Sequence, residues 1–300
     1  MSTIWLPPGV REGALQSNPS AWATQRRGLV TASRFADVLT EPRTPPRSFV
    51  DQWLHLIPEG ERTKVLKSGP RAGQMVEADG IPSRVVEAAA QQGAFCWGDT
   101  ARSYMMELLA SAITGEERVG GKSAAMERGN DMEADALDRY QSDRFAEVHK
   151  ARLLTFEGTR IGATPDGFIE EDTEGEGPGI IEVKSPESKR HMQTWLEREL
   201  PTEYVEQVQG QLWVTGRAWC DFVSFDDRFP HPMQIVVIRV KRDEDLIARM
   251  AARVHAFADE LTERERRVRS YLADCMPEER DIVHQALQDA AETPTLAPEA

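Results

Sequence analysis

The chain has 300 residues, enough to bury a substantial core, and its composition does not force a division into two domains. Its formal charge of −14 argues against a protein that coats DNA with its whole surface. The scattered cysteines argue against a disulfide framework or a zinc site, and no basic apolar leader or apolar run of membrane length is present, so we expect a cytoplasmic protein without a membrane span.

The N-terminal part is the least acidic part of the chain. Residues 1–80 carry ten Lys and Arg against eight Asp and Glu, so positive potential is expected there. Residues 1–20 predict an extended lead-in, and Thr31 or Ser33 can cap a helix over residues 32–39. The free N–H groups at the start of such a helix would be a natural seat for a phosphate group.

Proline and glycine interrupt the next part of the chain, residues 43–98. Fragments at 48–56 and 81–91 could form short helices within it. An apolar stripe then predicts a core helix over residues 101–114, with Thr100 as its cap.

A second helix is predicted over residues 124–141, and it carries Glu133 on one face. An exposed glutamate on a solvated face is the usual interpretation of such a residue. Residues 153–156 and 160–162 then predict the two strands of a hairpin, which leads into a Pro-Asp-Gly turn at Asp166.

An acid and an amine stand two positions apart in residues 179–186, where Glu182 and Lys184 lie among β-branched neighbours. Glycine and proline bound this stretch, which predicts a short strand. Because strand side chains alternate between faces, Glu182 and Lys184 should project together while their apolar neighbours point the other way. Asp166 converges on Glu182 if the two strands pair.

Asp166 and Glu182, beside the backbone carbonyl of Val183, would make an all-oxygen donor set. Such a set suits Mg²⁺, which keeps several of its waters, and Mn²⁺ can take its place. A metal-activated water can attack a phosphorus atom, and Lys184 would hold or deprotonate that water. An isolated Glu-x-Lys is more often a solvated strand pair, but the upstream Pro-Asp-Gly favours a metal-dependent nuclease site.

Polar side chains recur on one face of a later helix. A helix over residues 192–200 is broken by proline, and the next is predicted over residues 202–214. On that second helix Tyr204, Gln207 and Gln211 share a face. Gln207 has no pKa to tune, so it would orient a water, an amine or a phosphate by hydrogen bonds, unless it is an ordinary surface glutamine.

The C-terminal third predicts further regular elements. Residues 219–225 and 233–242 are rich in β-forming residues, and a long charged helix is predicted over residues 243–271. A final helical segment over residues 280–291 and a disordered tail over residues 293–300 complete the prediction.

The Pro-Asp-Gly and Glu-Val-Lys pattern resembles the PD-(D/E)xK nuclease signature. The neighbouring residues resemble one branch of it, the phage lambda exonuclease and YqaJ-type viral recombinase family. Four blocks carry the resemblance in the family's order, with weaker similarity to about residue 263, and they are residues 22–43, 128–140, 163–186 and 205–214.

The resemblance implies roles for particular side chains. Arg26 and Ser33 match residues associated with binding the 5′ phosphate of the degraded strand, with Arg27 as the rival for Arg26. Thr164 stands where the family more often has serine and keeps a hydroxyl for the phosphate. Glu133 matches a metal-associated glutamate, which weakens its interpretation as a surface residue.

The fold class that follows is α/β with a restriction-endonuclease-like core. We expect a central mixed sheet, flanked by helices and with the metal site at one edge, from strands near residues 153, 160, 167, 180, 219 and 234. One nuclease domain should cover residues 1–275, with a helical segment and disordered tail over residues 276–300. Within it, residues at about 43–98 form an insertion relative to the family, and its role stays open among a lid, an assembly contact and a substrate guide.

The function that the resemblance implies is a magnesium-dependent exonuclease of phage or prophage recombination. It would degrade one strand of linear duplex DNA from the 5′ end and hand the 3′ overhang to a single-strand annealing protein. A ring-shaped homotrimer that encircles DNA is also implied. The alternatives are an endonuclease or end-trimming nuclease on the same core, and a catalytically silent DNA-binding or assembly protein.

Overall fold

A computed structural model describes residues 4–15, 18–42, 59–77, 94–116, 124–171 and 175–275, with a few positions between 49 and 92. The predicted segments 280–291 and 293–300, and most of 48–56 and 81–91, lie outside these residues. The chain forms two compact units, Met1–Ala36 with Met105–Ala300, and Asp37–Tyr104. The domain boundaries expected from the sequence stay a prediction. Within the described residues, no helix has the length and apolarity that crossing a bilayer would require.

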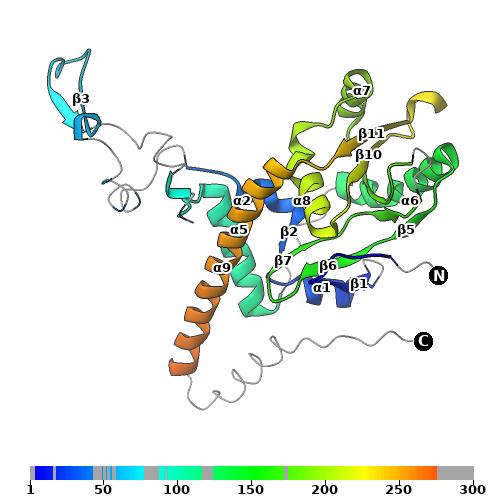
Figure 1. Ribbon diagram of the computed structural model, residues 1–300, viewed down its shortest axis with the longest axis horizontal. Coiled ribbons are helices and arrows are strands. Elements are labelled where there is room, and N and C mark those ends of the chain that lie inside the picture. Colours follow the sequence, from blue (N-terminus) through cyan, green and yellow to red (C-terminus); the bar gives the residue numbers. More distant parts are fainter. Residues whose placement is uncertain are drawn as a thin grey trace. The chain divides into compact units, whose positions relative to one another are not determined.

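A five-stranded mixed sheet forms the centre of the first unit (Figure 1). Strand β9 (Gly179–Lys184) runs parallel to β10 (Trp219–Phe225), and the other neighbouring pairs of strands are antiparallel. The apolar runs in β9 and β10 explain their burial on both faces, since each is covered on two sides. The strand order is β11 (Ile235–Lys241), β10 (Trp219–Phe225), β9 (Gly179–Lys184), β8 (Gly167–Ile169) and β5 (Val148–Lys150).

A second sheet of four strands contains the hairpin predicted near residues 153 and 160. A strand within the predicted lead-in, which the sequence interpretation missed, pairs with that hairpin. The hairpin therefore belongs to a sheet separate from the five-stranded one. The expectation of one sheet from all six strands is therefore wrong, whereas the α/β fold with mixed sheets flanked by helices is confirmed. The strand order is β1 (Val10–Leu15), β6 (Arg152–Phe156), β7 (Ile161–Ala163) and β2 (Val30–Thr31).

Most helices follow the predicted ranges, but the N-terminal helix over Pro19–Arg26 was not predicted. The helix expected over residues 192–200 begins earlier, at Ser188, and ends earlier, at Glu197, because Arg198 adopts a left-handed conformation with φ of 56°. The helices are α1 (Pro19–Arg26), α2 (Phe35–Val38), α5 (Asp99–Thr114), α6 (Ala124–Arg144), α7 (Ser188–Glu197), α8 (Val205–Thr215) and α9 (Glu244–Cys275). Short 3-10 turns are η1 (Ala32–Arg34), η3 (Glu59–Glu61), η4 (Thr202–Tyr204) and η5 (His231–Met233).

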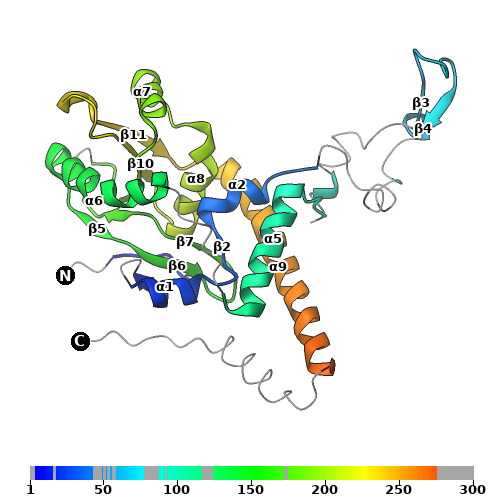
Figure 2. The ribbon, with the colours of Figure 1, turned by 180° about the vertical axis from the view of Figure 1, so that it is seen from behind.

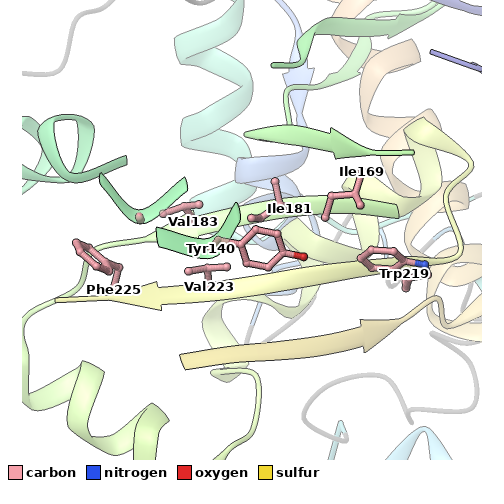
Figure 3. Packing of buried hydrophobic residues seen from close by; sticks show 8 residues of the cluster. Tyr140, Ile169, Ile181, Val183, Trp219, Val223 and Phe225 are labelled. Atoms are coloured by element: carbon pink, nitrogen blue, oxygen red, sulfur yellow. The ribbon is translucent and has the colours of Figure 1, made fainter. Parts of the chain in front are cut away.

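Helices α6 and α8 lie on opposite faces of the five-stranded sheet. Tyr140 of α6 packs on Ile181 and Val183 of β9 in the main apolar cluster (Figure 3). Helix α8 contacts β10 of this sheet and β6 and β7 of the other, so it joins the two sheets, as Figure 2 shows from behind. The alternation of β9 therefore directs its apolar side chains toward α6 and its polar ones toward α8.

The second unit contains an antiparallel hairpin of β3 (Thr63–Val65) and β4 (Met75–Glu77). Elsewhere in this unit the Thr40 side chain accepts a hydrogen bond of 3.1 Å from the Ala101 amide, near the start of α5. The helix predicted over residues 101–114 is present but begins at Asp99.

Candidate functional site

Glu182 and Lys184 project from the same face of β9, as the period-2 pattern predicts. The Lys184 ammonium donates a hydrogen bond to Oε1 of Glu182. Glu182 is buried with a relative exposure of 2%, so protein groups such as Lys184 replace water as the hydrogen-bond partners of its carboxylate. Strand β9 is an inner strand between β8 and β10, and the expectation of a site at the sheet edge is therefore wrong.

Asp166 lies immediately before β8 and is held by β9. Its amide donates to the Ile181 carbonyl at 3.1 Å, and its Oδ2 accepts from the Val183 amide at 2.6 Å. The pairing of β8 with β9 thus brings Asp166 beside Glu182, as predicted. Val183 enters the site through its amide, and a metal-binding role for its carbonyl stays a prediction.

Two glutamines of α8 hold both oxygens of Glu182. Gln207 donates to Oε1, and Gln211 donates to Oε2 at 2.7 Å. The Gln211 side chain is buried, and its amide nitrogen also faces the Thr164 carbonyl at 3.5 Å, so the amide orientation is determined by two acceptors. The sequence interpretation placed Gln211 on this face but gave it no role. Its spacing of four residues from Gln207 was the available signal.

Glu133 of α6 lines the same cavity, but Lys150 of β5 binds it at 2.6 Å. Lys150 was not singled out from the sequence, because strand β5 itself was not predicted. Among the described residues, no group of three or more His, Cys, Asp or Glu side chains is arranged to hold a metal ion. Metal binding by Asp166, Glu182 and Glu133 therefore stays a prediction, and Glu133 is paired with Lys150 in this structure.

The charged side chains of the site shift one another's pKa values. Burial raises the pKa of the Asp166 carboxyl well above its usual range, and Glu182 and Glu133 raise it further against the opposing effect of Lys184. Burial alone would lower the pKa of Lys184, but Glu182 and Asp166 outweigh it and raise that pKa above the ordinary value. The neighbouring carboxylates therefore favour the ammonium form of Lys184, and its role toward a water or a phosphate stays a prediction.

A second group of side chains surrounds Arg26, the last residue of α1. Its Nη2 atom lies 3.4 Å from the hydroxyls of both Thr31 and Ser33, and its guanidinium lies 4.5 Å from the centre of the Trp22 ring. Thr31 makes no capping hydrogen bond to the backbone of η1. The predicted capped helix is instead a 3-10 turn followed by the short α2, and a phosphate seat at its N-terminus stays a prediction.

Gly210 of α8 explains why the two groups are adjacent. A Cβ at this position would lie 2.5 Å from the Phe35 ring and 3.2 Å from the Ala32 Cβ. Glycine inside a helix costs about 1 kcal/mol relative to alanine, and here it allows η1 and α2 to pack directly on α8. Ser33 is thereby brought next to the helix that carries Gln207 and Gln211.

Both groups line one cavity of about 440 Å³. Every side chain predicted from the sequence as a site residue lines it, including Thr164, whereas the rival Arg27 does not. The structure thus brings together the acid and amine group and the Arg26 group. What each residue does there stays a prediction.

Comparisons with known proteins identify a family and several solved structures that are similar to this chain. Residues 21–218 match the family model for the YqaJ-like viral recombinase domain. An alkaline exonuclease from Laribacter hongkongensis, LHK-Exo, is 29% identical with a TM-score of 0.61, covering 85% of this chain and 99% of that one. LHK-Exo in complex with dAMP gives 30% identity and a TM-score of 0.60, with the same coverage.

A phage related exonuclease from Haemophilus somnus is 16% identical with a TM-score of 0.48, covering 78% of this chain and 94% of that one. A comparison with curated proteins gives no match.

Proposed function

Because this chain belongs to the YqaJ-like viral recombinase domain family, we propose that it is a metal-dependent exonuclease that degrades one strand of linear duplex DNA from the 5′ end. The similarity to an alkaline exonuclease over 85% of the chain supports the exonuclease activity. The 3′ single strand left behind would serve phage-type recombination through a single-strand annealing protein.

One observation carries the proposal of direction. The cavity combines the acid and amine group of β9 with the guanidinium and hydroxyls around Arg26. A guanidinium can bind a terminal phosphate through two parallel hydrogen bonds, so a 5′ phosphate at Arg26 would fix which nucleotide lies over Asp166 and Glu182. A related enzyme has been solved with dAMP, a single nucleotide, which is the size of group that this arrangement would release.

The donor chemistry fits a hard divalent cation such as Mg²⁺ or Mn²⁺. Asp166 and Glu182 offer carboxylate oxygens, and a cation would offset the burial and the neighbouring negative charge that raise the pKa of Asp166. The Val183 carbonyl would be a further ligand of the cation. Glu133 would also bind the cation once its ion pair with Lys150 is broken. When bound, the cation would activate a water and polarise the scissile phosphate.

The protein side chains around the cation would position the reactants. The Lys184 ammonium would hold the attacking water and neutralise charge that develops on the phosphate oxygens. Gln207 and Gln211 would keep both oxygens of Glu182 in place. This assignment gives Lys184 an electrostatic role, and the attacking water would lose its proton to solvent because a bound cation lowers the pKa of that water.

The test compares end-labelled linear duplex with closed circular DNA, each with Mg²⁺ and with a chelator. An exonuclease gives products only from the linear substrate, and labels on the 5′ or 3′ ends report the direction. Nicked circles would instead indicate an endonuclease, and no products with Mg²⁺ or Mn²⁺ would indicate a silent DNA-binding protein. We also propose a homotrimer, which a monomer mass in light scattering with and without DNA would contradict.

Arg26→Ala is expected to slow digestion of 5′-phosphorylated ends by roughly tenfold to a hundredfold. This is the factor for losing a charge-assisted hydrogen bond of about 1.5–3 kcal/mol. Digestion of 5′-hydroxyl ends should change much less. Arg27→Ala is the matched control, since Arg27 does not line the cavity, and equal losses on both substrates would exclude phosphate recognition by Arg26.

Gln211→Met is expected to lower turnover by about tenfold and to raise the Mg²⁺ concentration needed for half-maximal rate, because Glu182 loses one of its orienting donors. Gln209→Met is the matched control on the same helix. Gln209 is also buried, but it binds the Lys241 carbonyl and the Asp243 amide, away from Glu182. If both variants shift the Mg²⁺ requirement alike, the effect is one of helix stability.

A further inference from the structure

The hairpin of β3 and β4 has no part in the function described so far. It lies in the segment for which the sequence left three roles open, a lid, an assembly contact and a substrate guide. Residues 62–76 hold no Asp or Glu, in a chain whose formal charge is −14. The four basic residues among them are Arg62, Lys64, Lys67 and Arg71.

The loop that joins the two strands is ordered by its own backbone. The amide of Gly73 donates to the Leu66 carbonyl at 2.8 Å, and the amide of Ala72 donates to the Gly69 carbonyl at 3.0 Å. Both glycines have positive φ, 88° and 87°, and nothing lies within 4 Å of a Cβ added at either. The glycines are therefore kept for the turn conformation rather than for packing.

Lys67 and Arg71 lie on this loop and are exposed. Because backbone hydrogen bonds hold the loop, the two cationic side chains extend from an ordered turn. Next to the loop, Val65 and Met75 are directly opposite each other across the strands, with exposures of 53% and 71%. The hairpin thus offers two kinds of surface, a basic loop and a small apolar pair.

We propose that the basic loop of this hairpin binds the phosphate backbone of the duplex DNA, as a contact in addition to the cavity. The inference rests on the proposed function, which supplies DNA as the ligand. Lysine and arginine bind phosphates without reading base sequence, which suits an exonuclease that digests any sequence. The rival occupants are a partner protein and a second copy of this acidic chain. The apolar surface consists of two residues, whereas a typical protein interface has about 20–30 residues on each side.

The binding test uses the full chain, a fluorescent linear duplex and a chelator, so that DNA is bound but not cut. Lys67→Ala with Arg71→Ala is compared with the wild type over a series of salt concentrations. The matched control, Lys189→Ala with Arg249→Ala, also removes two exposed cations. An apolar variant, Val65→Thr with Met75→Gln, tests the other surface of the hairpin.

The loop variant is expected to bind more weakly at low salt and to lower the steepness of the plot of log affinity against log salt by roughly two, about 0.9 for each lost phosphate contact. The control and the apolar variant should keep the wild-type slope. An unchanged slope in the loop variant overturns the inference. If the loop variant has a lower oligomer mass in light scattering, or if the apolar variant loses more DNA affinity than the loop variant, the inference is overturned in favour of a protein contact.

Failure of this inference is distinct from failure of the proposed function. If the wild type digests linear duplex but the loop variant binds with the same salt dependence, only the hairpin contact is wrong. If the wild type neither binds nor digests duplex DNA, both are wrong.

Discussion

Asp166→Asn, Glu182→Gln and Lys184→Met are each expected to lower DNA cleavage by at least about a hundredfold to a thousandfold. That range is the loss found when one group that stabilises developing charge is removed from an active site. The alanine variants should lose cleavage as well. Lys184 contacts Glu182, and Asp166 contacts the strand that carries both. The losses of cleavage rate in the single variants should therefore not add in double variants.

The folding of these variants separates catalysis from structure. Burial and two neighbouring carboxylates raise the pKa of Asp166, so its charged form is less favourable in the folded state than in the unfolded state. Removing that charge in Asp166→Asn should leave the denaturation midpoint unchanged or higher in metal-free buffer. The same substitution should weaken Mg²⁺ binding, measured by calorimetry or by the stabilisation that added Mg²⁺ gives.

A charge-matched control is available nearby. Glu171 is exposed and lies after β8, so Glu171→Gln removes one negative charge without touching the cavity. It should cut DNA at the wild-type rate. Near wild-type cleavage by any of the three site variants, with Mg²⁺ and at matched protein concentration, would show that the proposed site is wrong.

The sequence predicted the centre of the site well because strand geometry is local. Two positions along a strand return to the same face, so Glu182 and Lys184 could be placed together without any tertiary information. Asp166 required one further assumption, that the strand after it pairs with β9, and the structure confirms that pairing. The spacing on α8 likewise placed Gln207 and Gln211 on one face.

The errors arise where a contact depends on a distant partner. Strand β1 lies in a stretch without clear periodicity and becomes a strand because β6 offers it a hydrogen-bonding edge. Lys150 binds Glu133 from β5, whose three residues are too few for a sequence pattern. The split into two sheets, and with it the packing of η1 on α8 at Gly210, could not be predicted from local propensity.

Asp221→Ala is expected to lower the free energy of unfolding by about 3–5 kcal/mol, the largest stability effect that we predict outside the cavity. Asp221 of β10 is buried, and both of its oxygens accept hydrogen bonds of 2.9 Å from Arg239 of the edge strand β11. The Tyr140 hydroxyl of α6 donates to the same carboxylate at 2.6 Å. Removing the carboxylate leaves the buried Tyr140 hydroxyl without its acceptor and leaves the largely covered Arg239 guanidinium with the more distant Glu176 at 3.4 Å, which is the costly way to break such a group.

Two further variants determine whether the effect belongs to this network. Tyr140→Phe removes one hydrogen bond and should cost only about 1–2 kcal/mol. Asp221→Leu combined with Arg239→Met replaces the buried pair by apolar side chains and should recover most of the stability lost in Asp221→Ala. Because Asp221 does not line the cavity, the folded fraction of each variant should cleave DNA at the wild-type rate. Urea denaturation followed by circular dichroism gives the free energies of unfolding. If Asp221→Ala has the wild-type denaturation midpoint, the pairing of Asp221 with Arg239 and Tyr140 does not stabilise the packing of α6, β10 and β11.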